Sequence, residues 1–132
     1  MRADALLEQV KFNADGLVIA VAQDHATGEV LMLAYMNEAT LRQTIETGVM
    51  TYWSRSRQKV WVKGESSGNT QIVRQASIDC DGDALLFKVE QQGAAACHTG
   101  RVSCFYRSLE GDDLVVTSEP QFDPNAVYGK GV

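Results

Sequence analysis

Three cysteines, Cys80, Cys97 and Cys104, carry the most distinctive chemistry in this sequence. An odd number of thiols cannot be fully paired in disulfides, so in a reducing compartment the alternatives are buried small side chains, a reactive thiol or metal ligands. Three thiolates with water as the fourth ligand form the donor set of an open zinc site. Spacing alone does not decide, because two buried cysteines beside a strand would explain Cys97 and Cys104 equally well.

His98 lies next to Cys97 and has three interpretations. It is a fourth ligand that would close a structural zinc site, a general base beside the metal, or an ordinary hydrogen-bonded histidine. Adjacency to a cysteine does not distinguish them. The other histidine, His25, lies in a predicted turn and is expected on the surface.

The segment 79–83 reads Asp-Cys-Asp-Gly-Asp. In extended geometry its aspartates face one way and Cys80 the other, which separates carboxylates suited to Mg²⁺ from a thiolate suited to Zn²⁺. Its first and last aspartates would then lie roughly 13 Å apart, at about 3.3 Å per residue. A shared ion therefore requires a curl at Gly82 or an intervening water. A solvated acidic turn is the alternative; an EF-hand is disfavoured because Ala84 stands where that loop needs glycine.

Residues 52–63 combine cations with aromatic side chains and contain no acid. The loop that follows, 64–68, offers backbone N–H groups and hydroxyls for a phosphate. The same stretch would also suit a nucleic-acid face, or an amphipathic strand with its tryptophans in the core. The residues concerned are Trp53, Arg55, Arg57, Lys59, Trp61, Lys63, Gly64, Ser66 and Ser67.

The elements that must position these residues are mostly strands. Apolar patterns predict a hairpin from strands 17–24 and 29–36, followed by a helix over 38–47 that begins at the N-cap Asn37 and ends at Gly48. Further extended segments are expected at 49–55, 59–63, 70–79, 84–90, 102–107 and 114–117. We predict an α+β fold, a strand-rich single domain with one main helix.

Length and charge limit the function classes. The chain has 132 residues, a size that suits one domain, and a net charge of −5, which opposes a general nucleic-acid surface. Residues 47–109 nevertheless carry eight basic side chains against five acids, which favours a phosphorylated ligand. No apolar run predicts a membrane span and the N-terminus does not resemble a signal peptide, so we expect a cytoplasmic protein.

Five sequence blocks together resemble the phosphoribosyl-AMP cyclohydrolase family of histidine biosynthesis. They are YMNEAT (35–40), TGVMTYWSRSR (47–57), VWVKGESSGNTQ (60–71), DCDGDALL (79–86) and ACHTGRVSCFYR (96–107). They span most of residues 17–108 in the family's order, within a single domain over 1–132 whose tail from 110 lies outside the motifs. The resemblance is to the monofunctional form.

The resemblance implies hydrolysis of the N1–C6 bond in the purine ring of N1-(5-phosphoribosyl)-AMP. It implies a homodimer in which zinc is held by Cys80 of one chain with Cys97 and Cys104 of the other. Magnesium would be held by Asp79, Asp81 and Asp83. We expect His98 to act as general base. The basic residues Arg55, Arg57 and Lys63, the 64–68 loop and Arg101, with Arg107 equally eligible, are expected to bind the two phosphates of the nucleotide.

Two other functions compete with this prediction. Zinc nucleobase deaminases also add water to a ring carbon, but they carry H-x-E and P-C-x-x-C signatures that this sequence lacks. A metal-stabilised RNA-binding module would use the 52–63 stretch, and the negative net charge opposes it.

Overall fold

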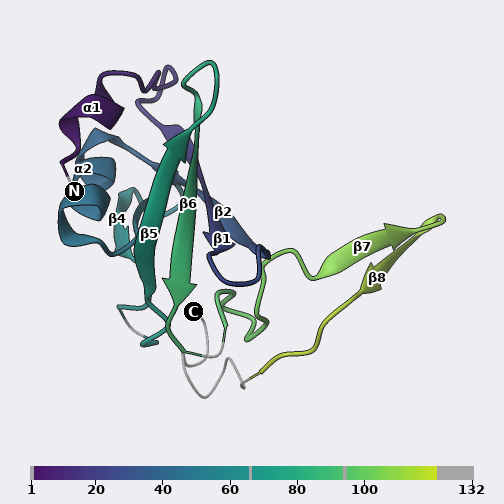
Figure 1. The fold of residues 1–132 in the computed structure, drawn as a ribbon. Coiled ribbons are helices and arrows are strands. Elements are labelled where there is room, and N and C mark those ends of the chain that lie inside the picture. Colours follow the sequence, from purple (N-terminus) through teal and green to yellow (C-terminus); the bar gives the residue numbers. More distant parts are fainter. Residues whose placement is uncertain (1, 66, 94, 122–132) are drawn as a thin grey trace.

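A six-stranded mixed sheet forms the body of the protein (Figure 1). The computed structural model describes residues 2–65, 67–93 and 95–121. The elements are α1 (Asp4–Leu7), β1 (Val18–Asp24), β2 (Val30–Met36), α2 (Glu38–Thr47), β3 (Thr51–Ser54), β4 (Lys59–Val62), β5 (Gln71–Ile78), β6 (Ala84–Gln91), β7 (Arg107–Glu110) and β8 (Asp113–Val116). Ser66, one of the predicted phosphate-binding residues, lies outside the described residues.

Helix α2 has the predicted bounds because both ends carry strong local signals. The Asn37 side chain accepts from the Thr40 backbone N–H, and the Thr40 hydroxyl accepts from the Asn37 N–H, which forms a capping box. Gly48 ends the helix in the left-handed region at φ 76°. The buried side chains Leu41 and Ile45 face the sheet as predicted from their spacing.

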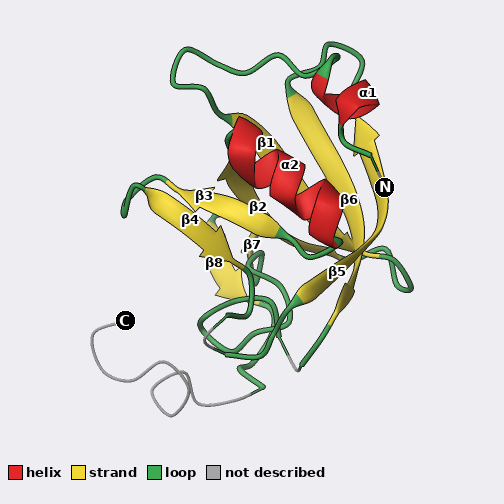
Figure 2. Cartoon of the chain, turned by 90° about the vertical axis from the view of Figure 1, so that its left-hand side faces the viewer, coloured by secondary structure: helices red, strands yellow, loops and turns green. Residues whose placement is uncertain are grey.

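The sheet order is β4-β3-β2-β1-β6-β5, with β1 and β6 parallel and the other pairs antiparallel. Both helices lie on one side of the sheet (Figures 1 and 2). The core forms between them and that face, around fully buried Tyr52, Phe87 and Met36. The predicted hairpin β1–β2 is confirmed. The α+β class is confirmed, with the short helix α1 in addition to the predicted main helix.

The acidic segment 79–83 is a turn, so the expectation of an extended segment is wrong. It curls at Gly82, whose φ is 78° and where a Cβ would clash with the backbone oxygen of Gln9. One Asp79 carboxylate oxygen accepts from the backbone N–H groups of Asp83 and Ala84, at 3.0 and 3.2 Å. The curl was one of the two conditions set for a shared ion, and this condition is met.

The predicted strand 102–107 is also wrong. The Ser103 hydroxyl donates to the Val30 carbonyl at 2.7 Å, and the Cys104 N–H donates to the Leu31 carbonyl at 2.7 Å. These contacts hold the segment as an irregular loop against the end of β2, and the strand β7 begins only at Arg107. The hairpin β7–β8 then extends away from the body as a projecting arm, on the side of the sheet opposite the helices (Figure 1).

Neither helix of the described part of the chain is long and apolar enough to span a membrane.

Candidate functional site

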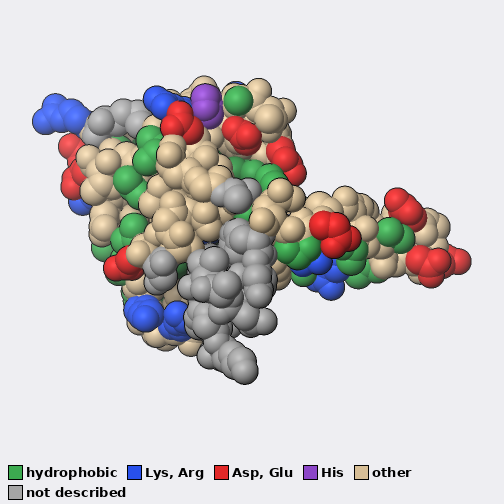
Figure 3. All heavy atoms as spheres, turned by 90° about the horizontal axis from the view of Figure 1, so that it is seen from below, with side chains coloured by type: hydrophobic (Ala, Val, Ile, Leu, Met, Phe, Trp, Pro, Cys, Tyr) green, Lys and Arg blue, Asp and Glu red, His purple; other side chains and the backbone are tan. Residues whose placement is uncertain are grey.

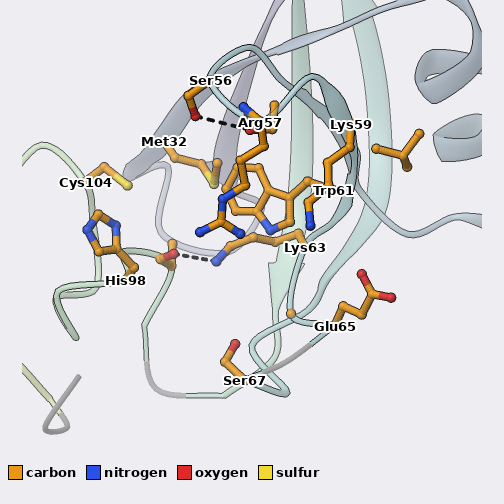
Figure 4. Close-up of a pocket in the computed structure, with 14 residues that line it drawn as sticks. Met32, Ser56, Arg57, Lys59, Trp61, Lys63, Glu65, Ser67, His98 and Cys104 are labelled. Carbon is orange, nitrogen blue, oxygen red and sulfur yellow. Dashed lines mark hydrogen bonds between the residues drawn. The ribbon is translucent and has the colours of Figure 1, made fainter. Parts of the chain in front are cut away.

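A pocket of about 440 Å³ collects side chains from three distant parts of the chain. It contains the predicted residues Arg57, Lys63, Gly64, Ser67, His98 and Cys104. Figure 4 shows the Arg57, Lys63 and His98 side chains and the Cys104 sulfur around one cavity, beside the indole ring of Trp61. This volume suits a small molecule, and the cations favour an anionic one.

Cys97 and Cys104 are neighbours at this site. A hydrogen bond from the Cys104 thiol, helped by the Thr99 hydroxyl donating to Cys97 Sγ at 3.0 Å, lowers the pKa of Cys97 to about 5. The same contact raises the pKa of Cys104. The two sulfurs therefore share one proton, and a cation that replaces this proton would find two thiolate donors side by side.

Lys63 is buried, with 3% of its surface exposed. Its Nζ donates to the Ala96 carbonyl at 2.6 Å and lies 5.7 Å from the centre of the Trp61 ring. Burial lowers the pKa of Lys63, and the negative charges of Cys104 and Cys97 oppose that shift. This cation joins the 60–63 stretch to the 96–104 loop beneath the pocket.

The three aspartates meet at a different place. Oxygens of Asp79, Asp81 and Asp83 lie within 4.8 Å of one another in the exposed turn between β5 and β6. Hydrogen bonds to the carboxylates of Asp81 and Asp79, together with their charges, raise the pKa of Asp83. Three crowded carboxylates form an oxygen donor set of the kind that Mg²⁺ prefers.

Cys80 lies in that same turn and is exposed. It stands at the start of β6, whereas Cys97 and Cys104 follow the other end of this strand (Figure 1). An eight-residue strand spans roughly 23 Å at about 3.3 Å per residue. Within one chain the structure brings two of the three predicted zinc ligands together and leaves the third at the opposite end of the sheet.

Three other predicted residues lie outside the pocket. Trp53 and Arg55 line a shallower hollow of about 260 Å³, where the Arg55 guanidinium stacks on the Tyr35 ring at 4.1 Å. The Arg101 guanidinium stacks on Tyr106 at 4.0 Å and donates from Nε to the Ser118 carbonyl at 2.9 Å. Arg101 thus holds the segment after β8 against the loop.

Several pocket residues were not predicted as site residues. Trp61 was considered for stacking or for the core, and it packs its ring at 5.4 Å from that of buried Tyr52 while it lines the pocket. The alternation of β4 places Trp61 on the same face as Lys63, which was the available signal. Met32 and Ala96 carry no such signal, because only tertiary contacts place them. The additional lining residues are Met32, Ser54, Ser56, Lys59, Val60, Trp61, Glu65 and Ala96.

Gly64 shapes the pocket rim, and Gly64→Ala is expected to lower the free energy of unfolding by about 1–3 kcal/mol. Its φ is 84°, and an added Cβ would clash with the backbone of Asn69 and Thr70. Urea denaturation measures the effect. Gly68→Ala is the matched control, since Gly68 has φ 79° but open space around its Cβ position. Equal losses in both variants would refute the steric part of this explanation.

Adjacent thiols, a histidine and several cations around one pocket are typical of an enzyme that acts on an anionic small molecule. The sequence model of the family described as phosphoribosyl-AMP cyclohydrolase matches residues 32–106. The phosphoribosyl-AMP cyclohydrolase of Methanothermobacter thermautotrophicus is 60% identical over 121 residues, which cover 90% of this chain and 87% of the relative. That of Desulfatibacillum aliphaticivorans is 58% identical over 115 residues, 87% and 92% of the two chains. That of Salinibacter ruber is 54% identical over 126 residues, 96% and 98%.

The chain belongs to the phosphoribosyl-AMP cyclohydrolase family and is an enzyme, a hydrolase.

Proposed function

We propose that the protein hydrolyses the N1–C6 bond in the purine ring of N1-(5-phosphoribosyl)-AMP, a step of histidine biosynthesis, and that it does so with zinc. The observation that carries the proposal is the convergence of His98, Cys104, Arg57 and Lys63 on one pocket. Family membership supplies the substrate. Ribosylation at N1 makes the purine ring cationic, and C6 becomes open to attack by water.

The donor set fits zinc. Cys97 and Cys104 share a proton, as expected of two thiols that jointly bind a soft cation, and Cys80 would be the third ligand. When bound there, zinc would supply a coordinated water with a pKa lowered toward neutrality. The exposed imidazole of His98 is close enough to the pocket to take the water's proton as a general base. The water oxygen then bonds to C6, and the C6–N1 bond breaks as N1 receives a proton.

The remaining pocket residues bind the nucleotide. Arg57 and Lys59 are free to contact phosphate oxygens, and the Ser67 hydroxyl lines the same wall. Lys63 is already engaged with Ala96, so it contributes positive charge from below the pocket rather than a flexible contact. The exposed Trp61 face offers a stacking surface for the purine.

A homodimer is part of the proposal because the third thiol comes from elsewhere. Cys80 is separated from Cys97 and Cys104 by the length of β6, so a second chain is the natural source of Cys80 for each site. A cytoplasmic location is also proposed, since three free thiols suit a reducing compartment.

We propose magnesium at the aspartate turn, and Asp83→Asn tests it. The raised pKa of Asp83 means that the fold disfavours its charge, so without metal this residue costs stability once the pH rises above that pKa. Asp83→Asn should therefore raise the melting temperature in EDTA at pH 7, with no gain below the carboxylate's pKa. It should weaken Mg²⁺ binding at least about tenfold. Calorimetry in EDTA and Mg²⁺ titration measure both; unchanged Mg²⁺ affinity would contradict the assignment.

The direct test of function is metal analysis coupled to a spectroscopic assay on the N1-ribosylated adenine nucleotide. We expect one zinc per chain, turnover that is lost on chelation, and turnover that returns with added Zn²⁺. Zinc without turnover would leave only a structural metal, and turnover in the metal-free protein would exclude the zinc mechanism.

A further inference from the structure

The projecting arm, β7–β8, is an amphipathic hairpin with its apolar face in solvent. Leu109 pairs with Leu114 across the two strands, and Val116 lies on the same face opposite Arg107. The exposed fractions are 72% for Leu109, 62% for Leu114 and 48% for Val116. A two-stranded hairpin alone is marginally stable in water. An arm with this composition therefore needs a surface to pack on.

The face of the sheet opposite the helices offers such a surface. Its apolar residues are directly paired across neighbouring strands, so they share one side: Leu86 with Val21, Val21 with Leu33, Ile19 with Tyr35, Tyr35 with Trp53, and Trp53 with Val60. We call this set the outer face. Leu33 is 45% and Val60 44% exposed, and the others are half-buried. In the described part of the chain no helix covers it (Figures 1 and 2).

Charge also matches between the two surfaces. The arm carries Glu110, Asp112 and Asp113 at its turn, and Figure 3 shows acidic side chains at the tip of the projection. The outer face carries Lys88 on β6 and Arg55 beside Tyr35. Among residues 2–65, 67–93 and 95–121, none of these five groups forms an ion pair.

We propose that the arm of each chain packs its apolar face on the outer face of a second copy of the same chain, in a reciprocal exchange. The arm leaves the body at about a right angle on the side of the outer face, so it leaves room there for a partner (Figure 1). The exchange is self-complementary, as a two-fold dimer requires. It also bears on the active site, because the arm follows Cys104 by three residues. The inference rests on the proposed homodimer and identifies the surface that makes it.

Leu109→Glu tests the arm, with Ser108→Glu as its matched control on the opposite face of the same strand. We expect Leu109→Glu to raise the dimer dissociation constant at least about a hundredfold in sedimentation experiments, and Ser108→Glu to change it less than about threefold. Leu33→Glu on the outer face should reproduce the effect of Leu109→Glu. A dimer that all three variants leave intact would overturn the arm exchange while the homodimer itself stands.

Hydrogen exchange in the wild-type protein gives a test that needs no variant. Amides of β7–β8 should be protected at concentrations where the dimer forms and should lose protection on dilution. Protection that is independent of concentration would mean that the arm is covered by its own chain and would overturn the proposal. A wild-type monomer with full turnover would overturn both the exchange and the shared zinc site, whereas a dimer without turnover would refute only the proposed reaction.

Discussion

Mixing a Cys80→Ser chain with a Cys97→Ser chain is expected to restore about a quarter of wild-type activity to two proteins that are each inactive. Each variant alone lacks one ligand at every shared site. Random mixing makes half of the dimers heterodimers, and each heterodimer combines an intact Cys80 with an intact Cys97 and Cys104 at one of its two sites. The measurement is turnover and zinc content after the two chains are refolded together.

The control pair is Cys97→Ser with Cys104→Ser. These two sulfurs lie side by side in one chain, so both variants damage the same half of the site and no mixed dimer contains an intact one. Restoration in the first pair and its absence in the second would establish that Cys80 comes from the partner. Equal failure of both pairs, in chains that demonstrably exchange, would contradict a zinc site shared between subunits.

His98→Ala is expected to keep zinc and to lower kcat by about 10²–10⁴-fold, the usual contribution of a general base. His98 lines the pocket on its exposed side, next to Cys104, where it can reach a water without taking part in holding the metal (Figure 4). Zinc content and steady-state kinetics of the same preparation measure the two effects separately.

His25→Ala is the control for loss of an imidazole. His25 lies in the turn after β1, with Nε2 at 3.9 Å from Glu90, and does not line the pocket. This variant should keep both zinc and turnover. If His98→Ala loses zinc instead, His98 is a ligand and the proposed proton transfer is wrong.

Much of the fold was predictable because its signals are local. The capping residues Asn37 and Gly48 determine both ends of α2 through contacts within four residues. The strands of the sheet follow from apolar alternation and from the turns between them. The spacing of 102–107 also resembled a strand, yet Ser103 and Cys104 bond to β2, some seventy residues earlier in the chain. Alternation does not reveal such a contact.

The candidate site divides in the same way. Residue types and motif order were enough to identify the family, and they named His98, Cys104, Arg57 and Lys63 in advance. They did not reveal that Tyr52, rather than either tryptophan, fills the core beside the pocket, or that Trp61 and Met32 line it. Those assignments depend on which face of a strand meets which partner, and the whole sheet decides that.

The three cysteines combine both kinds of information. The sequence alone determined their number and chemistry, because ligand type is a property of the side chain. Tertiary structure decided that Cys97 and Cys104 adjoin while Cys80 lies at the other end of β6. The physical reason is that a strand is stiff and extended, so residues before and after it are held apart, and only a loop such as 97–104 can fold back to bring its two ends together.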